Sequence, residues 1–175
     1  MEDLFPPLYW KQLQSDNKMS RRKKAIYFQR EAGRPAPLVA ASMRKVRFEE
    51  VDPLGIVWHG RYASYLEDGR VAFGEKYDLS YMTMRKERFL APIVQMHVDY
   101  HSPLRYDDDF TIAARLVWSD AVKLNFEYIL ENSKGMVAAT GYTVQLLTDP
   151  EQNVLLARPP FVENLCRRWM KGEIT

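Results

Sequence analysis

Four segments in the second half of the chain place apolar residues at every second position. In the last of them the alternating set is Ala138, Thr140, Tyr142, Val144 and Leu146. The four segments are residues 93–101, 110–118, 124–130 and 136–148. A period of two is typical of strands with one buried face, and the intervening Asp- and Gly-containing turns favour an antiparallel meander. One antiparallel sheet is therefore predicted.

A single long helix is predicted to precede this meander. Apolar and small residues recur at helical spacing between residues 59 and 77, and Gly69 and Ala72 would suit close packing on a sheet. An extended strand is predicted over residues 43–51, because Asp52 precedes a proline and such residues avoid the helical region. The pair Pro159-Pro160 introduces a short closing helix, since proline is favoured in a first helical turn.

The order of elements is strand, helix and four strands, which predicts an α+β domain with a five-stranded sheet. One helix can cover only one face of such a sheet. The other face is expected to be covered by a second copy of the chain, although the N-terminal segment could cover part of it. A homodimer, or a homotetramer built as a dimer of dimers, is the expected assembly.

The first 41 residues differ in character from the remainder. Residues 1–41 contain eight Lys/Arg and four Asp/Glu, whereas residues 42–175 contain 17 and 19. We therefore predict an N-terminal extension over 1–41 and one domain over 42–175, as the total of 175 residues allows. The charge of the domain argues against a nucleic-acid-binding surface, and only the extension is basic enough to contact phosphates.

Composition favours a cytoplasmic location without metal chemistry. No apolar stretch approaches the roughly 18 residues of a membrane helix, and the first residues lack a signal-peptide pattern. The single cysteine, Cys166, allows no internal disulfide and fits a reducing compartment. His97 and His101 lie in a predicted strand, where four residues span about 13 Å, so they cannot share one ion. No metal and no cofactor are expected.

The segment from Asp52 to Arg61 contains the main candidate for chemistry. A carboxylate stands in a Pro/Gly turn, and seven residues later His59 opens the predicted helix. A helix N-terminus offers unpaired N–H groups and positive potential, which suit an oxyanion. The alternative is turn chemistry, in which Asp52 only stabilises the loop before Pro53. An ordinary N-cap is excluded, because it bonds two or three residues ahead.

The spacing of this segment resembles the signature of the 4-hydroxybenzoyl-CoA thioesterase family. These are hotdog-fold acyl-CoA thioesterases, which include the bacterial enzymes associated with the Tol-Pal system. Residues 98–109 are similar to the family's second-strand segment, and the likeness covers about residues 43–170. The matching positions are Asp52, Gly55, His59, Tyr62, Tyr65, Glu67 and Arg70.

The resemblance implies a hotdog domain, a sheet wrapped around one long helix, with active sites at a dimer interface. It implies hydrolysis of an acyl-CoA to a carboxylic acid and CoA, with Asp52 as general base or nucleophile. The N–H groups of His59 and Gly60 would bind the thioester oxygen, and the His59 imidazole would orient water or act only through its backbone. Gly55, Trp58, Tyr62 and Glu67 are expected to contact substrate or support the pocket.

Three alternatives remain open at this point. The first is a thioesterase of the same fold that acts on acyl-carrier protein, which the basic extension could meet. The second is a non-catalytic hotdog sensor that binds acyl-CoA. A dehydratase of the same fold is disfavoured by the Asp52–His59 spacing.

Overall fold

The computed structural model describes residues 27–30 and 32–175. Their order of elements is strand, short helices, long helix, short helix, four strands and closing helix. The strands are β1 (Leu38–Lys45), β2 (Ile93–Tyr100), β3 (Asp109–Val117), β4 (Lys123–Asn132) and β5 (Val137–Leu146). The helices are η2 (Phe48–Glu50), η3 (His59–Arg61), α2 (Tyr62–Lys76), α3 (Tyr81–Lys86) and α4 (Pro160–Met170).

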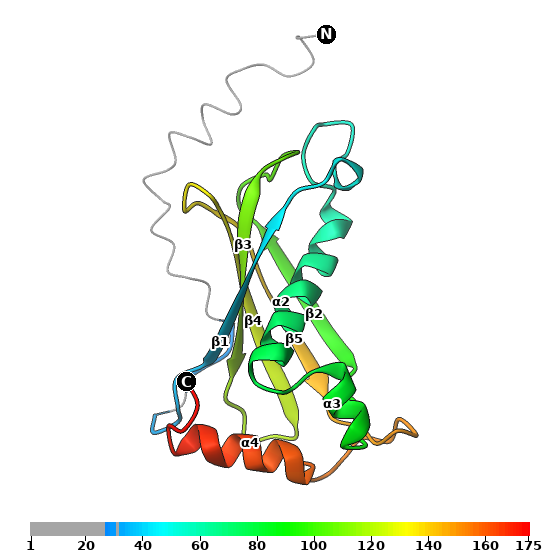
Figure 1. The fold of residues 1–175 in the computed structure, drawn as a ribbon, viewed down its shortest axis with the longest axis vertical. Helices are drawn as coiled ribbons and strands as arrows, with labels where there is room; N and C mark the ends of the chain where they lie inside the picture. Colours follow the sequence, from blue (N-terminus) through cyan, green and yellow to red (C-terminus); the bar gives the residue numbers. More distant parts are fainter. Residues whose placement is uncertain (1–26, 31) are drawn as a thin grey trace.

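The five strands form one antiparallel sheet in the order β1-β3-β4-β5-β2. The helix α2 lies along one face of this sheet, and α4 lies across one end (Figure 1). We call the face that α2 covers the inner face and the opposite one the outer face. The predicted α+β architecture, with five strands and one long helix, is confirmed.

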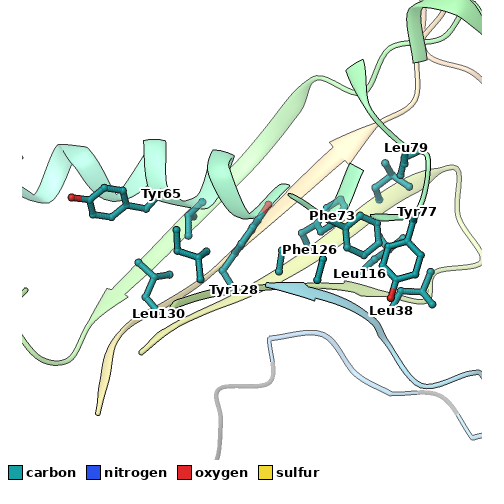
Figure 2. Close-up of a cluster of buried hydrophobic side chains, with 14 of the residues drawn as sticks. Leu38, Tyr65, Phe73, Tyr77, Leu79, Leu116, Phe126, Tyr128 and Leu130 are labelled. Carbon is teal, nitrogen blue, oxygen red and sulfur yellow. The ribbon is translucent and has the colours of Figure 1, made fainter. Parts of the chain in front are cut away.

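The core lies between α2 and the inner face. Aromatic and aliphatic side chains from the helix meet those of β3 and β4, with Phe73 edge-on to Phe126 at 4.9 Å between ring centroids (Figure 2). Gly69 lets the helix approach closely, because a Cβ built there would stand 2.8 Å from Ile112 Cγ2. The prediction that a small residue of the helix serves close packing is confirmed for Gly69.

The structure contains most of the predicted elements. The bounds of one strand differ from the prediction, and one short helix was not predicted. The four strands of the meander and the closing helix agree with their predicted segments to within a few residues. The strand predicted over 43–51 is wrong in its bounds: β1 ends at Lys45, and η2 follows. Residues 38–41 of β1 therefore lie within the predicted N-terminal extension. The short helix α3 had not been predicted.

The predicted face of β5 is wrong. Register pairs Phe126 with Thr143 and Glu127 with Tyr142, so Thr143 faces α2 and Tyr142 lies on the outer face. The polar inner residues are satisfied by hydrogen bonds: the Tyr128 hydroxyl lies 3.1 Å from Thr143 Oγ1, and an Arg70 guanidinium N–H donates to Gln145 Oε1. These bonds let polar residues of β5 stand where the alternation predicted apolar ones.

Part of the outer face is covered by the chain's own N-terminal segment. Tyr27 packs against Tyr142 with ring centroids 5.1 Å apart, and Phe28 meets the same ring edge-on at 5.3 Å. The sequence had left two possible covers for this face, a second copy of the chain and the N-terminal segment. Residues 1–26 and 31 of the predicted extension lie outside the described residues.

Among the helices that the described residues form, none is long and apolar enough to span a bilayer.

The packing at Gly69 gives a stability prediction. Gly69→Val should destabilise the fold by about 1–3 kcal/mol, because the added methyl groups would overlap Ile112 and force α2 from the sheet. Urea unfolding measures the difference. Ala63→Val, at an exposed position of the same helix, is the matched control and should stay within about 0.5 kcal/mol of the parent. Equal loss in both variants would contradict the close approach.

Candidate active site

The segment between η2 and η3 forms a closed turn. Val51 and Val57 are bridge partners, and inside them the Asp52 N–H donates to Ile56 O at 2.9 Å. The Gly55 N–H donates to Asp52 O at 2.9 Å, and Gly55 has a φ of 71°, which favours glycine. The predicted residue Gly55 therefore shapes the turn through its backbone.

The Asp52 carboxylate takes part in the turn with one of its two oxygens. Its Oδ1 accepts the Leu54 N–H at 2.8 Å, which is the Asx-type bond expected of a turn residue. Within the described part of the chain, Oδ2 has no hydrogen-bond partner. The carboxylate is half-buried, so the turn fixes its position and leaves one oxygen available.

His59 and Gly60 begin the helical segment that leads into α2. The first backbone bond of this segment runs from the Arg61 N–H to Trp58 O at 2.9 Å. The N–H groups of His59 and Gly60 precede that bond, and neither has a partner in residues 27–30 and 32–175. Both residues are exposed, and their two donors stand at the positive end of the helix.

Two aromatic side chains flank this helix start. The Trp58 indole lies over Gly60, where a Cβ would come within 2.4 Å of its ring carbons. On the other side the Tyr100 hydroxyl donates to His59 O at 3.1 Å. Tyr100 had not been predicted as a site residue, and its only signal in the sequence was its inward place in the alternation of β2.

Tyr62 lies beneath the helix start and is only 3 % exposed. Its ring meets Tyr100 edge-on at 4.9 Å. Burial raises the pKa of the Tyr62 hydroxyl to about 12, so this group stays protonated at neutral pH. The position favours a supporting role for Tyr62 over direct substrate contact.

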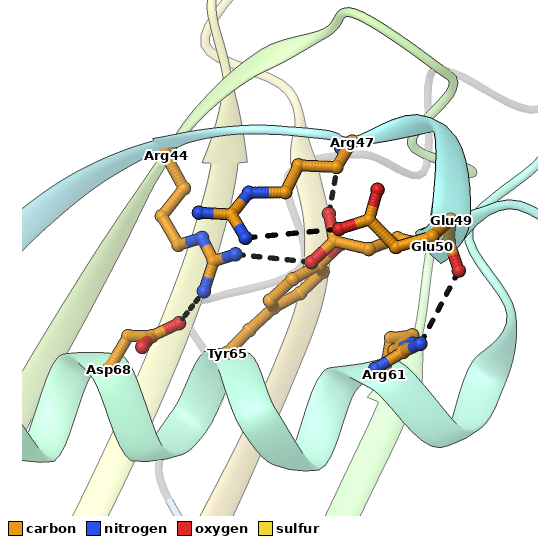
Figure 3. Close-up of polar contacts among 7 residues, drawn as sticks. All are labelled: Arg44, Arg47, Glu49, Glu50, Arg61, Tyr65 and Asp68. Carbon is orange, nitrogen blue, oxygen red and sulfur yellow. Dashed lines mark hydrogen bonds and ion pairs between the residues drawn. The ribbon is translucent and has the colours of Figure 1, made fainter.

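A buried ionic cluster fixes η2, which leads into the Asp52 turn (Figure 3). Glu50, 6 % exposed, accepts the Arg47 N–H at 2.8 Å, the Tyr65 hydroxyl at 3.0 Å and an Arg44 guanidinium N–H at 3.1 Å. Arg44 also pairs with Asp68 of α2. Burial is the main cause that raises the pKa of the Tyr65 hydroxyl, which therefore remains a donor to Glu50. The cluster ties β1, η2 and α2 together.

Glu67 stands further along α2 and joins a different cluster. Its carboxylate accepts hydrogen bonds from Arg70 Nη2, at 2.6 Å, and from the Tyr81 hydroxyl. The Arg70 guanidinium also lies 4.5 Å from the centroid of the Tyr81 ring. The predicted Glu67–Arg70 pair one turn apart is present. Glu67 is eight residues from His59, which is about 12 Å along a helix, so one chain does not bring the two together.

A cavity of about 140 Å³ lies beside this second cluster. Arg70, Glu75, Ser80 and Gln145 contribute polar groups to its lining, and the remaining lining is mostly apolar. The apolar lining includes Val71, Phe73, Leu79, Met82, Met84 and Phe126. Arg70 is eleven residues from His59, so the cavity lies about 16 Å along α2 from the helix start of the same chain.

The other groups considered from the sequence have structural partners. His97 lies on the outer face with Nε2 3.1 Å from Asp99 Oδ1, and His101 Nε2 lies 2.8 Å from Thr140 Oγ1. Burial raises the pKa of the Cys166 thiol, which disfavours a thiolate. No group of three or more potential metal ligands is found in the part of the chain that the structure describes.

The structure thus gathers part of the predicted site. Asp52, Gly55, Trp58, His59 and Gly60 share the turn and the helix start, Tyr62 supports them from below, and Glu67 lies apart. The clusters that hold the site, above all Arg44 with Glu50 and Asp68, had not been predicted, because ion pairs between different elements leave no periodic pattern in the sequence.

Comparison with known proteins places this geometry in a family. Residues 46–168 match the thioesterase-like superfamily, and the chain belongs to it. The hotdog fold and the class of enzyme, a thioester hydrolase, are thereby confirmed. The narrower 4-hydroxybenzoyl-CoA subfamily stays a prediction.

Individual relatives agree with this placement. The Escherichia coli protein named acyl-CoA thioester hydrolase YbgC is 24% identical over 106 residues, which cover 61% of this chain and 79% of that protein. The Arabidopsis thaliana acyl-acyl carrier protein thioesterase ATL3, chloroplastic, is 30% identical over 105 residues, covering 58% of this chain and 55% of that one. The DHNA-CoA thioesterase structure from Staphylococcus aureus superposes with a TM-score of 0.67 at 22% identity, covering 78% and 97%.

The Glu50 cluster gives a second stability prediction. Tyr65→Phe should cost about 1.5–3 kcal/mol, because it removes a donor from a buried carboxylate without changing the shape of the ring. Chemical denaturation measures the loss. Tyr106→Phe, at an exposed tyrosine, should be close to neutral and serves as control. A Tyr65→Phe variant as stable as the parent would show that the bond to Glu50 contributes nothing.

Proposed function

We propose that the protein hydrolyses an acyl-CoA thioester to a free carboxylic acid and CoA. The observation that supports this most is the helix start at His59 and Gly60. Two N–H groups that have no partner among the described residues stand there, just beyond the turn that holds the Asp52 carboxylate. A thioester carbonyl needs both features: donors for its oxygen, and a base or nucleophile for its carbon.

In this proposal the thioester oxygen accepts the N–H groups of His59 and Gly60. Negative charge grows on this oxygen as the tetrahedral intermediate forms, and each preorganised donor at such a position is worth about 2.7–4 kcal/mol. The positive end of the helix adds to the stabilisation. The indole of Trp58 shields one side of the donors from water, since it lies over Gly60.

Asp52 acts on the carbonyl carbon in one of two ways. As general base, its Oδ2 takes a proton from water while the water oxygen bonds to the carbon, and the C–S bond then breaks. As nucleophile, the carboxylate itself displaces CoA thiolate to give a mixed anhydride, which water hydrolyses. A thiol of pKa near 8.5 leaves as thiolate without a strong acid, so few titratable groups are needed.

The His59 side chain and backbone can be tested separately. His59→Ala keeps the N–H and removes the imidazole. A large fall in kcat would assign the ring a part in orienting water or Asp52. An unchanged kcat would mean that His59 contributes to catalysis only through its backbone N–H.

We further propose that a second copy of the chain completes the site. The cavity beside Arg70 is too far along α2 to serve the helix start of its own chain, and a second subunit could bring the two together. The strand β2 is an edge of the sheet and exposes Val94, Met96 and Tyr100 by 53 %, 43 % and 54 %. An exposed apolar edge strand is a template for pairing with another chain. This edge supports the expected homodimer or homotetramer.

A specific observation favours acyl-carrier protein as a second candidate donor of the acyl group. The relative named as an acyl-acyl carrier protein thioesterase is 30% identical over 105 residues, and the first 41 residues carry an excess of basic side chains. Hydrolysis of one acyl group presented on CoA and on carrier protein separates the two, because the better donor gives the higher kcat/KM.

The role of Asp52 gives a kinetic prediction. Asp52→Asn keeps the bond to the Leu54 N–H and removes the charge, so kcat for acyl-CoA hydrolysis should fall by about 10²–10⁴-fold with little change in stability. A panel of acyl-CoA substrates, from short aliphatic to aromatic, first identifies one that the parent hydrolyses. Asp107→Asn, at an exposed aspartate, is the matched control and should keep the parent rate. Parent-like hydrolysis by Asp52→Asn would refute the mechanism.

A further inference from the structure

The outer face of the sheet contains a carboxylate that the hydrolytic mechanism does not use. Glu127 stands in the middle of β4, and its side chain is 1 % exposed. Its register partners Arg115 in β3 and Tyr142 in β5 lie on the same face. Neither residue bonds to the carboxylate in the part of the chain that the structure describes. A buried carboxylate needs other partners, because burial without them is costly.

Among the described residues, the hydrogen-bond partners of the Glu127 carboxylate all come from one short segment, residues 27–30, which we call the strap. Oε1 accepts the backbone N–H groups of Tyr27 and Phe28 at 2.9 and 3.1 Å. Oε2 accepts Arg30 Nη2 at 2.6 Å. Three donors, one of them charged, therefore hold the strap on the sheet by charge-assisted bonds, which are the strong kind.

The side chains of the strap add a second anchor on β2 and β5. The Tyr27 hydroxyl donates to Asp99 Oδ2 at 2.6 Å and lies 2.7 Å from Thr140 Oγ1. The Tyr27 ring packs against both Tyr142 and His97, at centroid distances of 5.1 and 5.8 Å. Burial raises the pKa of the Tyr27 hydroxyl to about 12, so it remains a donor at physiological pH. The strap is thus fitted to this face at two points.

The surface around the strap would otherwise favour association. Ile129 and Val144 belong to the outer face by register and are 5 % and 8 % exposed. With Tyr142 they are the apolar part of a face that also holds polar residues such as Arg115 and Asp99, and apolar residues of a sheet face are what packs on a second sheet. The strap covers the part of this face at Glu127, Tyr142 and His97.

We propose that the strap occupies the outer face and prevents a second copy of the chain from stacking on it, sheet against sheet. Self-association then uses other surfaces, such as the β2 edge, and an assembly built by stacking outer faces is blocked. The occupant of this face is residues 27–30 of the same chain. The proposal is independent of the hydrolytic activity.

Arg30→Glu in the full-length chain tests the proposal. The new carboxylate would stand against Glu127 and expel the strap. We expect amide hydrogen exchange at Tyr27 and Phe28 to speed up at least ten-fold. We also expect sedimentation velocity to show a larger species that grows with protein concentration, whereas the parent keeps one size. Arg168→Glu, an exposed position on α4, makes the same change of charge and should behave like the parent.

Two further variants keep the test decisive. Arg30→Glu combined with Glu127→Gln removes the repulsion, so parent-like exchange and size should return. Phe28→Ser removes the phenyl ring that packs on Tyr142 and keeps the backbone bonds to the Glu127 carboxylate. It should speed up amide exchange and increase the size of the species as Arg30→Glu does, but by less. Faster exchange without larger species would overturn the proposal. Rapid exchange at Tyr27 and Phe28 in the parent would overturn it as well.

Discussion

The burial of one side of α2 against the inner face of the sheet is the interaction on which the rest of the structure depends. The missing side chain at Gly69 lets the helix come close to β3, and rings from Tyr65 to Phe73 then fill the space along β3 and β4. This contact sets the height and direction of the helix. The helix start at His59 is placed by the same contact, so the donors of the candidate site are positioned by core packing some distance away.

Two buried carboxylates fix the position of segments that belong neither to the long helix nor to a strand. Glu50 holds η2 on the inner side through Arg44, Arg47 and Tyr65, and Glu127 holds residues 27–30 on the outer side. Glu50 belongs to its short segment and gathers donors from β1 and α2, whereas Glu127 belongs to the sheet and gathers its donors from the short segment. Such segments bury too little apolar surface to be fixed by packing alone, and charge-assisted hydrogen bonds supply the missing order.

Local patterns predicted the fold well wherever one face of an element is apolar. The alternation in residues 93–101 predicted β2, and the proline pair predicted the start of α4. The same reasoning misplaced β1, because the rule for residues before proline applies to Asp52 and says nothing of where the strand ends. It also assigned β5 to the wrong face, since Thr143 and Gln145 are buried against α2 by hydrogen bonds that no period in the sequence reveals.

The site was predictable only in part for a related reason. Spacing alone located Asp52 and the helix start, because turn and helix are local. Tyr100 bonds to His59, 41 residues away, and Glu50 to Tyr65, 15 residues away, and only the folded chain brings these together.

The indole of Trp58 over Gly60 has a consequence for the history of this chain. The ring and any side chain at position 60 compete for one small volume at the mouth of the helix. A descendant that gains even a methyl group at position 60 must turn or lose the indole, and one that keeps the indole must keep the glycine. The indole at position 58 and the glycine at position 60 are therefore coupled by space, and a change at one alters what the other can be.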